Sequence, residues 1–144
     1  MDENRKKEIL TELNNWREGK TMAHFLEIVF TDVTEDSLSA TMPVQAKTHQ
    51  PYGILHGGAS CVLAETLGSC LSYLHVDTNK VVPVGTNINS NHLRAKKEGI
   101  VTGTATFIRK GNTLHVSQIE IRDEKGHLIN HTTMTNTIIP KGTV

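Results

Sequence analysis

A histidine followed by two glycines, His56-Gly57-Gly58, precedes a long uncharged segment with one exception, Glu65. Residues 57–74 have the apolar spacing of a helix, and glycines at a helix start leave backbone N–H groups open to approach. The helix dipole adds positive potential there, so such a helix start binds an anion or polarises a carbonyl oxygen. Combined with a carboxylate, the pattern indicates acyl transfer or hydrolysis.

Gly57 and Glu65 cannot act on one carbonyl within a single chain. They are separated by about 12 Å along a helix, whereas the donor and the attacking group must each lie within about 3 Å of the reacting atoms. Antiparallel pairing with a second copy of the helix would bring Gly57 of one chain to Glu65 of the other. We therefore expect a homodimer with active sites at the subunit interface. Ser69 follows Glu65 by one helical turn and can hydrogen-bond it or a substrate.

The helix is predicted to be buried on two sides. An apolar stripe should pack on a sheet: Ala59, Val62, Leu63, Thr66, Leu67, Cys70, Leu71 and Leu74. Apart from Glu65, the other side carries small uncharged residues: Cys61, Ala64, Gly68, Ser69 and Ser72. A solvated face would normally carry Lys, Glu or Arg. A partner helix is the expected neighbour, and a poorly decorated surface helix is the alternative.

The remaining elements predict an α+β fold. Residues 3–16 form an amphipathic helix with Asp2 as its N-cap, and a short helical turn is possible at 22–25. Strands are expected at residues 26–34, 38–44, 81–91, 100–109, 113–122 and 127–139, and the short turns between the last four favour antiparallel hairpins. Residues 45–55 form a polar loop. The 144 residues fit one domain, with 1–24 as an N-terminal helical extension.

Composition excludes several classes of protein. The formal net charge is zero, so the basic excess of a nucleic-acid binder is absent. No apolar run reaches the roughly 20 residues of a membrane span, and the charged N-terminus lacks the apolar core of a signal peptide. Cys61 and Cys70 would lie about 13 Å apart on opposite sides of the helix, which excludes a disulfide between them. Two free thiols favour the cytoplasm.

Three segments resemble the hotdog-fold acyl-CoA thioesterases: 49–69 (HQPYGILHGGASCVLAETLGS), 84–94 (VGTNINSNHLR) and 119–128 (IEIRDEKGHL). The resemblance is closest to the branch of 1,4-dihydroxy-2-naphthoyl-CoA, enterobactin-proofreading and Arthrobacter-type 4-hydroxybenzoyl-CoA thioesterases. With the strand pattern it covers roughly residues 25–139. It implies a hotdog fold, in which an antiparallel sheet of about five to six strands wraps around one long central helix. It also implies a dimer of dimers and no metal or cofactor.

The resemblance assigns a role to each matching residue. Glu65 matches the catalytic carboxylate, a nucleophile or general base, and Gly57 matches the N–H that polarises the thioester carbonyl. Gln50 and His56 match residues that orient the thioester and the leaving group, and Ser69 matches a hydroxyl that assists the carboxylate. Substrate or CoA contacts are implied for Gly58, Val84, Gly85, Asn91, His92, Arg94, Lys110, Gly111, Asn112 and Thr113. The chain departs from relatives at Thr86-Asn87, which bears on the acyl group, and at Asn112-Thr113, which bears on CoA contacts.

The expected reaction is hydrolysis of an aryl-type acyl-CoA, with 1,4-dihydroxy-2-naphthoyl-CoA or a benzoyl-CoA-like thioester as best candidates. One alternative is a broad medium-chain acyl-CoA or acyl-carrier-protein proofreading thioesterase. Another is a hotdog protein that binds acyl-CoA without catalysis. A hotdog dehydratase is disfavoured, because residues 49–58 resemble the thioesterase loop.

Other hydrolytic chemistries fit poorly. His127 and His131 share a strand face but lie roughly 13 Å apart, too far to bind one metal ion. Residues 58–62 lack the second glycine of a serine nucleophile elbow. The two cysteines lie within the helix with no paired base, as packing residues do.

Overall fold

The computed structural model describes residues 1–16 and 19–143, so residues 17 and 18 of the predicted N-terminal extension lie outside the described part. The elements are α1 (Glu3–Asn15), α2 (Met22–Phe25), β1 (Val29–Val33), β2 (Ser37–Val44), the 3-10 helix η1 (Ala46–Thr48), α3 (Gly57–Tyr73), β3 (Val81–His92), β4 (Gly99–Lys110), β5 (Leu114–Asp123) and β6 (Leu128–Pro140). The strands form one antiparallel sheet in the order β1-β2-β4-β5-β6-β3. No helix in the described ranges is long and apolar enough to cross a bilayer.

The α+β prediction is confirmed, with one strand too long, one short helix missed and one predicted hairpin absent. The strands at 81–91 and 100–109 do not pair with each other, because β3 pairs with β6 and β4 lies between β2 and β5. β1 begins at Val29 rather than at residue 26, because Leu26 ends α2 and Glu27 adopts a left-handed conformation with a φ of 56°. The Ile28 N–H donates to Ala23 O at 2.9 Å, so these residues turn the chain instead of extending it. The short helix η1 lies in the predicted loop.

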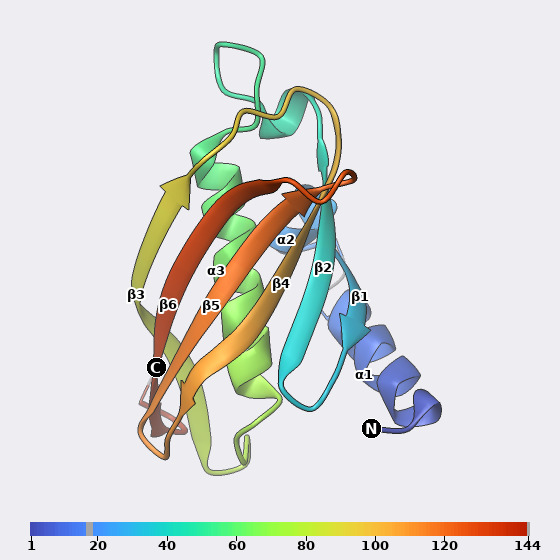
Figure 1. Ribbon diagram of the computed structural model, residues 1–144. Coiled ribbons are helices and arrows are strands. Elements are labelled where there is room, and N and C mark those ends of the chain that lie inside the picture. The colour runs from blue at the N-terminus through green and yellow to red at the C-terminus, as the bar shows by residue number, and fades with distance from the viewer. Residues whose placement is uncertain (17–18, 144) are drawn as a thin grey trace.

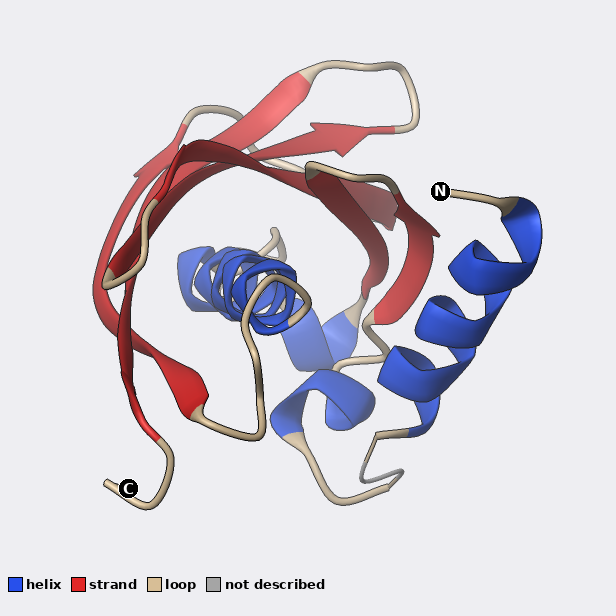
Figure 2. Cartoon of the chain, turned by 90° about the horizontal axis from the view of Figure 1, so that it is seen from below, coloured by secondary structure: helices blue, strands red, loops and turns tan. Residues whose placement is uncertain are grey.

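The sheet curls around α3, which lies inside its concave face (Figures 1 and 2). This is the hotdog arrangement that the resemblance implied. Leu63, Leu67 and Leu71 of α3 are fully buried in a core with apolar residues of β2, β4, β5 and β6. Gly103 of β4 makes room for this packing, since a Cβ there would lie 2.6 Å from Leu67 Cδ1.

The sheet contacts a wider part of the helix than predicted, because the predicted stripe of Leu63, Leu67 and Leu71 faces it and residues of the predicted outer side do so too. Ala64, Gly68 and Ser72, assigned to the outer side, are buried, and a Cβ on Gly68 would lie 2.6 Å from Met134 Sδ. The Asn136 amide on β6 donates to Gly68 O at 3.1 Å and to Ser72 Oγ at 2.8 Å. Small residues therefore admit the sheet, because a curled sheet covers more than half of the helix circumference.

The side of α3 that remains partly exposed carries Cys61, Glu65 and Ser69, as predicted, and also Thr66 and Cys70 from the predicted apolar stripe. These residues line cavities, and Cys70 also packs against the core. The partly open side therefore carries the carboxylate that the sequence singled out.

The two edge strands of the sheet, β1 and β3, differ in how far other parts of the chain cover them. At β1, the Asn14 side chain of α1 donates from Nδ2 to Phe30 O at 3.0 Å and accepts the Phe30 N–H at Oδ1 at 2.8 Å. The amide thus takes the place of a neighbouring strand on the outward-facing backbone of β1. Helix α1 packs beside β1 (Figure 2). The opposite edge is β3, a 12-residue strand with an exposed run from Gly85 to Asn89.

Candidate active site

The start of α3 is capped in a way that leaves one backbone N–H open. His56 is the N-cap residue, and its Nδ1 accepts the Gly58 N–H at 2.8 Å. The Ala59 and Ser60 N–H groups both donate to His56 O, at 3.0 and 3.2 Å. Within the described residues the Gly57 N–H makes no such bond, so it is the group that can point at an incoming oxygen.

A cavity of about 340 Å³ opens beside this helix start. Four predicted site residues line it: Gln50, Gly57, His92 and Arg94. A glycine is required at position 57, because a Cβ there would lie 2.6 Å from His92 Nε2. The cavity therefore brings the open N–H together with the ring of a histidine from β3.

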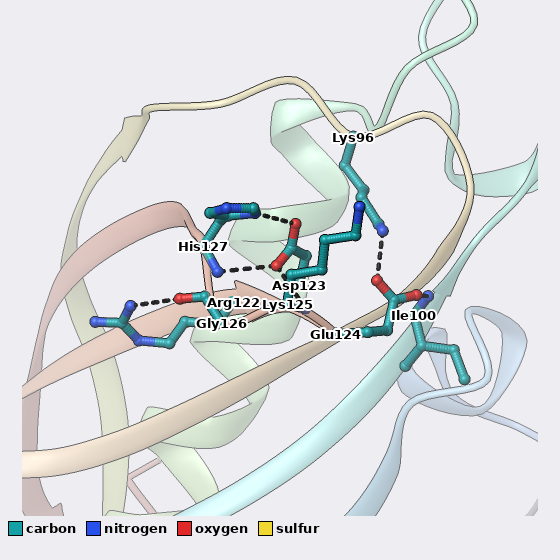
Figure 3. A network of polar contacts seen from close by, with 8 residues as sticks. All are labelled: Lys96, Ile100, Arg122, Asp123, Glu124, Lys125, Gly126 and His127. Atoms are coloured by element: carbon teal, nitrogen blue, oxygen red, sulfur yellow. Dashed lines mark hydrogen bonds and ion pairs between the residues drawn. The ribbon is translucent and has the colours of Figure 1, made fainter.

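A polar network fixes the chain segment that carries Arg94 into this cavity (Figure 3). Glu124, in the turn between β5 and β6, pairs with Lys96 Nζ at 2.5 Å and accepts the Ile100 N–H at 2.5 Å. The Lys96 ammonium, together with the Ile100 N–H, lowers the pKa of the Glu124 carboxyl to about 2. Lys96 O in turn accepts the Leu55 N–H at 2.7 Å, which ties the segment to the loop before α3.

Glu65 lies in a second cavity of about 370 Å³, two turns further along α3. Its carboxylate rests on β3 at Gly85, where a Cβ would overlap Oε1. Met22, Cys61, Val62, Thr66 and Ile88 line the same cavity, and their side chains are largely apolar. Burial raises the pKa of the Glu65 carboxyl, as expected for a carboxylate prepared to act as a base.

Some predicted site residues lie apart from both cavities in the single chain. Ser69 lines a neighbouring cavity with Tyr73, and no hydrogen bond joins it to Glu65 within the described residues. Residues 110–113 turn the chain between β4 and β5, and Lys110 pairs with Asp36 at 3.8 Å, next to β2's start and far from the Gly57 end of α3 (Figure 1).

Sequence reasoning missed two sets of residues beside the site. Met22 and Ile88, from α2 and β3, line the Glu65 cavity. Asn130 on β6 is fully buried and donates to His92 Nδ1 at 3.0 Å. The sequence did hold a signal for Asn130, because an asparagine at an inward-facing strand position is buried and needs hydrogen-bond partners.

The chemistry of the two cavities is complementary. One supplies an open helix-start N–H, a group able to stabilise the negative oxygen of a tetrahedral intermediate. The other supplies a partly desolvated carboxylate against apolar walls. With the curled sheet and central helix, these features define a hotdog-fold thioesterase.

The comparison with known proteins agrees. Residues 52–130 match the model of the thioesterase superfamily, and the chain belongs to this family. It is 45% identical, over 94% of this chain and 98% of the relative, to the 1,4-dihydroxy-2-naphthoyl-CoA hydrolase of Escherichia coli. It is 47% identical, over 74% of this chain and 77% of the relative, to the proofreading thioesterase EntH of Cronobacter sakazakii. A crystal structure of a mutant thioesterase from Pseudomonas aeruginosa superposes with a TM-score of 0.88 at 42% identity, covering 91% of this chain and 94% of that one.

Proposed function

We propose that this thioesterase hydrolyses an aryl-type acyl-CoA, with 1,4-dihydroxy-2-naphthoyl-CoA or a benzoyl-CoA-like thioester as the leading candidates. The observation that carries the proposal is the Glu65 carboxylate, whose pKa is raised in a largely apolar cavity. The name of the Escherichia coli relative supports the naphthoyl substrate. The name of EntH supports the alternative, a broader proofreading thioesterase.

In the proposed reaction, the Gly57 N–H binds the thioester carbonyl oxygen and polarises the carbon. Glu65 either attacks this carbon, forming a mixed anhydride that water then hydrolyses, or activates a water that attacks the carbon directly. In both routes the thiolate of CoA leaves and the free acid is released. His56 accepts the Gly58 N–H at Nδ1, so its ring proton is on Nε2 and can hydrogen-bond the leaving sulfur. Gln50 lines the same cavity and orients the thioester, and Ser69 assists Glu65 once substrate is bound.

The proposed active site is shared between two subunits. Gly57 and Glu65 lie about 12 Å apart along α3, and they line separate cavities. The exposed β3 edge supports a two-fold pairing of β3 with its own copy, because Asn14 occupies the backbone of the other edge. Such a pairing sets the two α3 helices antiparallel and brings Gly57 to the partner's Glu65.

A dimer of dimers is the second level of assembly that we propose, as the resemblance to the family implies. In one chain the turn at residues 110–113 lies at the opposite end of the sheet from the start of α3 (Figure 1). In the proposed assembly, Lys110, Gly111, Asn112 and Thr113 would therefore contact the phosphates of a CoA bound to a different subunit. His92, Arg94 and Asn91 would contact the nearer parts of CoA, at the end of β3.

Largely apolar cavities beside Glu65 support a bulky acyl group. The Glu65 cavity shares Thr66 with a cavity of about 290 Å³ under α1 and α2. Trp16 and Cys70 connect that cavity to a third one that ends at Tyr73, whose ring lies 4.8 Å from the Trp16 ring. We propose that the acyl group lies along this path and that the described N-terminal residues, 1–16 and 19–24, form its outer wall. Gly85 of β3 lies against the Glu65 carboxylate at the start of this path, and we expect Val84 beside it to contact the acyl group.

A reducing cytoplasm is the proposed location, because Cys61 and Cys70 are both free thiols. We also propose that residues 1–144 form one thioesterase domain.

The test is thiol release from a panel of benzoyl-CoA, 1,4-dihydroxy-2-naphthoyl-CoA and medium-chain acyl-CoAs, with an acyl-carrier-protein thioester as a further substrate. We expect the highest kcat/KM with an aryl substrate and a loss of about 10³-fold or more in Glu65→Ala, because the attacking group is removed. Hydrolysis that survives this substitution would overturn the role of Glu65. Tight binding without turnover would instead support an acyl-CoA-binding protein.

A pair of variants isolates the Gly57 N–H. Proline fits the first position of a helix and removes only this N–H, and Gly57→Ala adds the same Cβ beside His92 while keeping it. We expect Gly57→Pro to lose about 10²–10³ in kcat relative to Gly57→Ala. Mixed dimers of Gly57→Pro and Glu65→Ala should regain activity, since each contains one complete site. Two inactive variants that stay inactive after subunit exchange would contradict the shared site.

A further inference from the structure

A closed ring of hydrogen bonds lies behind His92. The Asn130 amide donates from Nδ2 to Ser90 Oγ at 2.8 Å, Ser90 Oγ lies 2.8 Å from Thr132 Oγ1, and Thr132 donates to Asn130 Oδ1 at 2.7 Å. Asn130 and Thr132 are fully buried. Because the Thr132 hydroxyl proton goes to Asn130, the Ser90 hydroxyl must donate to Thr132. The ring is therefore satisfied, and it leaves one Asn130 amide proton for a partner outside it.

That remaining proton determines the tautomer of His92. The Asn130 amide donates it to His92 Nδ1 at 3.0 Å, so Nδ1 accepts and the proton of the neutral imidazole is on Nε2. Nε2 is the ring atom nearest to Gly57, 2.6 Å from the position that a Cβ would occupy there. The His92 N–H thus points at the helix start, inside the cavity that also contains the Gly57 N–H.

We infer that Asn130 is a positioning residue that holds His92 as a neutral Nε2–H donor, and that this N–H is the second donor to the thioester carbonyl oxygen beside the Gly57 N–H. The inference rests on the proposed function and goes beyond the expected contact of His92 with CoA. No proton is transferred to the oxygen. The imidazole N–H stabilises the negative charge that develops on the oxygen as the tetrahedral intermediate forms. This charge is lost again when the thiolate leaves and the carbonyl re-forms.

The expected kinetics separate this role from structural support. His92→Phe keeps a ring and removes the donor, and should lose about 10²-fold in kcat. Asn130→Leu should lose about 10-fold, because the ring is free to turn or to change tautomer. The double variant should lose no more kcat than His92→Phe, since Asn130 acts through His92. Asn136→Leu is the matched control, because Asn136 is also buried on the inner face of β6 but contacts α3 instead.

A second variant at the same position gives a further signature. In Asn130→Asp the carboxylate accepts a proton from Nδ1, so the neutral ring has its proton on Nδ1 and leaves a bare Nε2 facing the oxygen. We expect Asn130→Asp to lose kcat, a loss that Asn136→Asp lacks.

The direct test is ¹⁵N NMR of the His92 ring in the full-length wild-type protein without substrate, together with these kinetics. The expected result is the Nε2–H tautomer in wild type and its loss in Asn130→Leu. An Nδ1–H tautomer in wild type, or a His92→Phe variant with wild-type kcat, overturns the inference while leaving thioester hydrolysis intact. Absence of thiol release from every acyl-CoA in wild type would instead refute the proposed function, and the tautomer would still be measured.

Discussion

Replacing Gly85 by alanine should disable the enzyme without unfolding it. A Cβ at this position would overlap Glu65 Oε1 and lie 3.0 Å from Met134 Cε. Carbon atoms in good contact are about 3.5–4.0 Å from their neighbours, so the carboxylate must retreat by roughly an ångström. A displacement of about 1 Å can cost about 10²-fold in rate, which corresponds to about 2.7 kcal/mol of transition-state stabilisation.

Stability should respond in the opposite way. Glu65 Oε1 is the far end of a flexible side chain, and alanine lowers the conformational entropy of the unfolded chain. The Tm of Gly85→Ala should therefore equal or exceed that of wild type. Gly103→Ala is the matched control, because its Cβ would lie 2.6 Å from Leu67 Cδ1 in the core. Overpacking of this kind costs about 1–3 kcal/mol, so this variant should lose Tm and keep its kcat.

The assay is kcat for acyl-CoA hydrolysis at a temperature where both variants are folded, combined with thermal unfolding followed by circular dichroism. The reasoning predicts a crossed result, with one variant losing catalysis and the other losing stability. Wild-type kcat in Gly85→Ala would refute the placement of the Glu65 carboxylate against β3. An equal kcat loss in both variants would show that general disturbance of the sheet explains the effect.

Four further predictions follow from the positions of individual side chains. The proposed helix pairing centres on Cys61, midway between Gly57 and Glu65, so a short bis-maleimide should link two chains in Cys70→Ser but not in Cys61→Ser. Cys70 should not react, because burial raises the pKa of its thiol to about 12. Cross-linking in Cys61→Ser but not in Cys70→Ser would exclude this register. Because the pKa of Glu65 is raised, kcat should fall as the pH is lowered, and this fall should begin at a higher pH than the usual carboxyl pKa of about 4.3 would give. Glu65→Gln should raise the Tm at neutral pH, by a difference that vanishes in acid, where the wild-type carboxyl is also neutral; a lower Tm at neutral pH would contradict this. Glu124→Gln should lower the Tm at pH 7, and this difference in Tm should disappear as the pH falls from about 4.3 toward about 2. The reason is that the Glu124 carboxyl, whose pKa is lowered to about 2, stabilises the fold only while it is ionised. A difference in Tm that does not depend on pH would show that the ion pair with Lys96 is not its cause.

Much of the fold was predictable from local patterns. Strand alternation and turn residues located all six strands, and the alternation corresponds to one buried face in β2, β4, β5 and β6. The error at residues 26–28 has a local cause, a left-handed Glu27 that apolar periodicity cannot reveal. The face of α3 was predicted wrongly for Ala64 and Gly68, because small residues fit equally well against a sheet or against a second helix.

The candidate site was predictable where chemistry leaves a local signature. His56-Gly57-Gly58 and Glu65 stand out because open N–H groups and an isolated carboxylate are uncommon on a helix. Asn130 was missed because its partners come from a different strand, and the pairing of β3 with β6 brings them together. Long-range contacts of this kind depend on strand order, which the local pattern does not specify.

The hydrogen bonds of Asn14 to β1 also bear on how many copies of the chain one sheet can join. A sheet with two open edges can add subunits head to tail without limit and form a fibre. With one edge occupied by a side-chain amide, growth by strand addition has a single direction. If β3 pairs with its own copy, no free edge strand remains in the dimer, and the continuous sheet ends at two chains. A single asparagine would then separate a finite enzyme from an open-ended polymer.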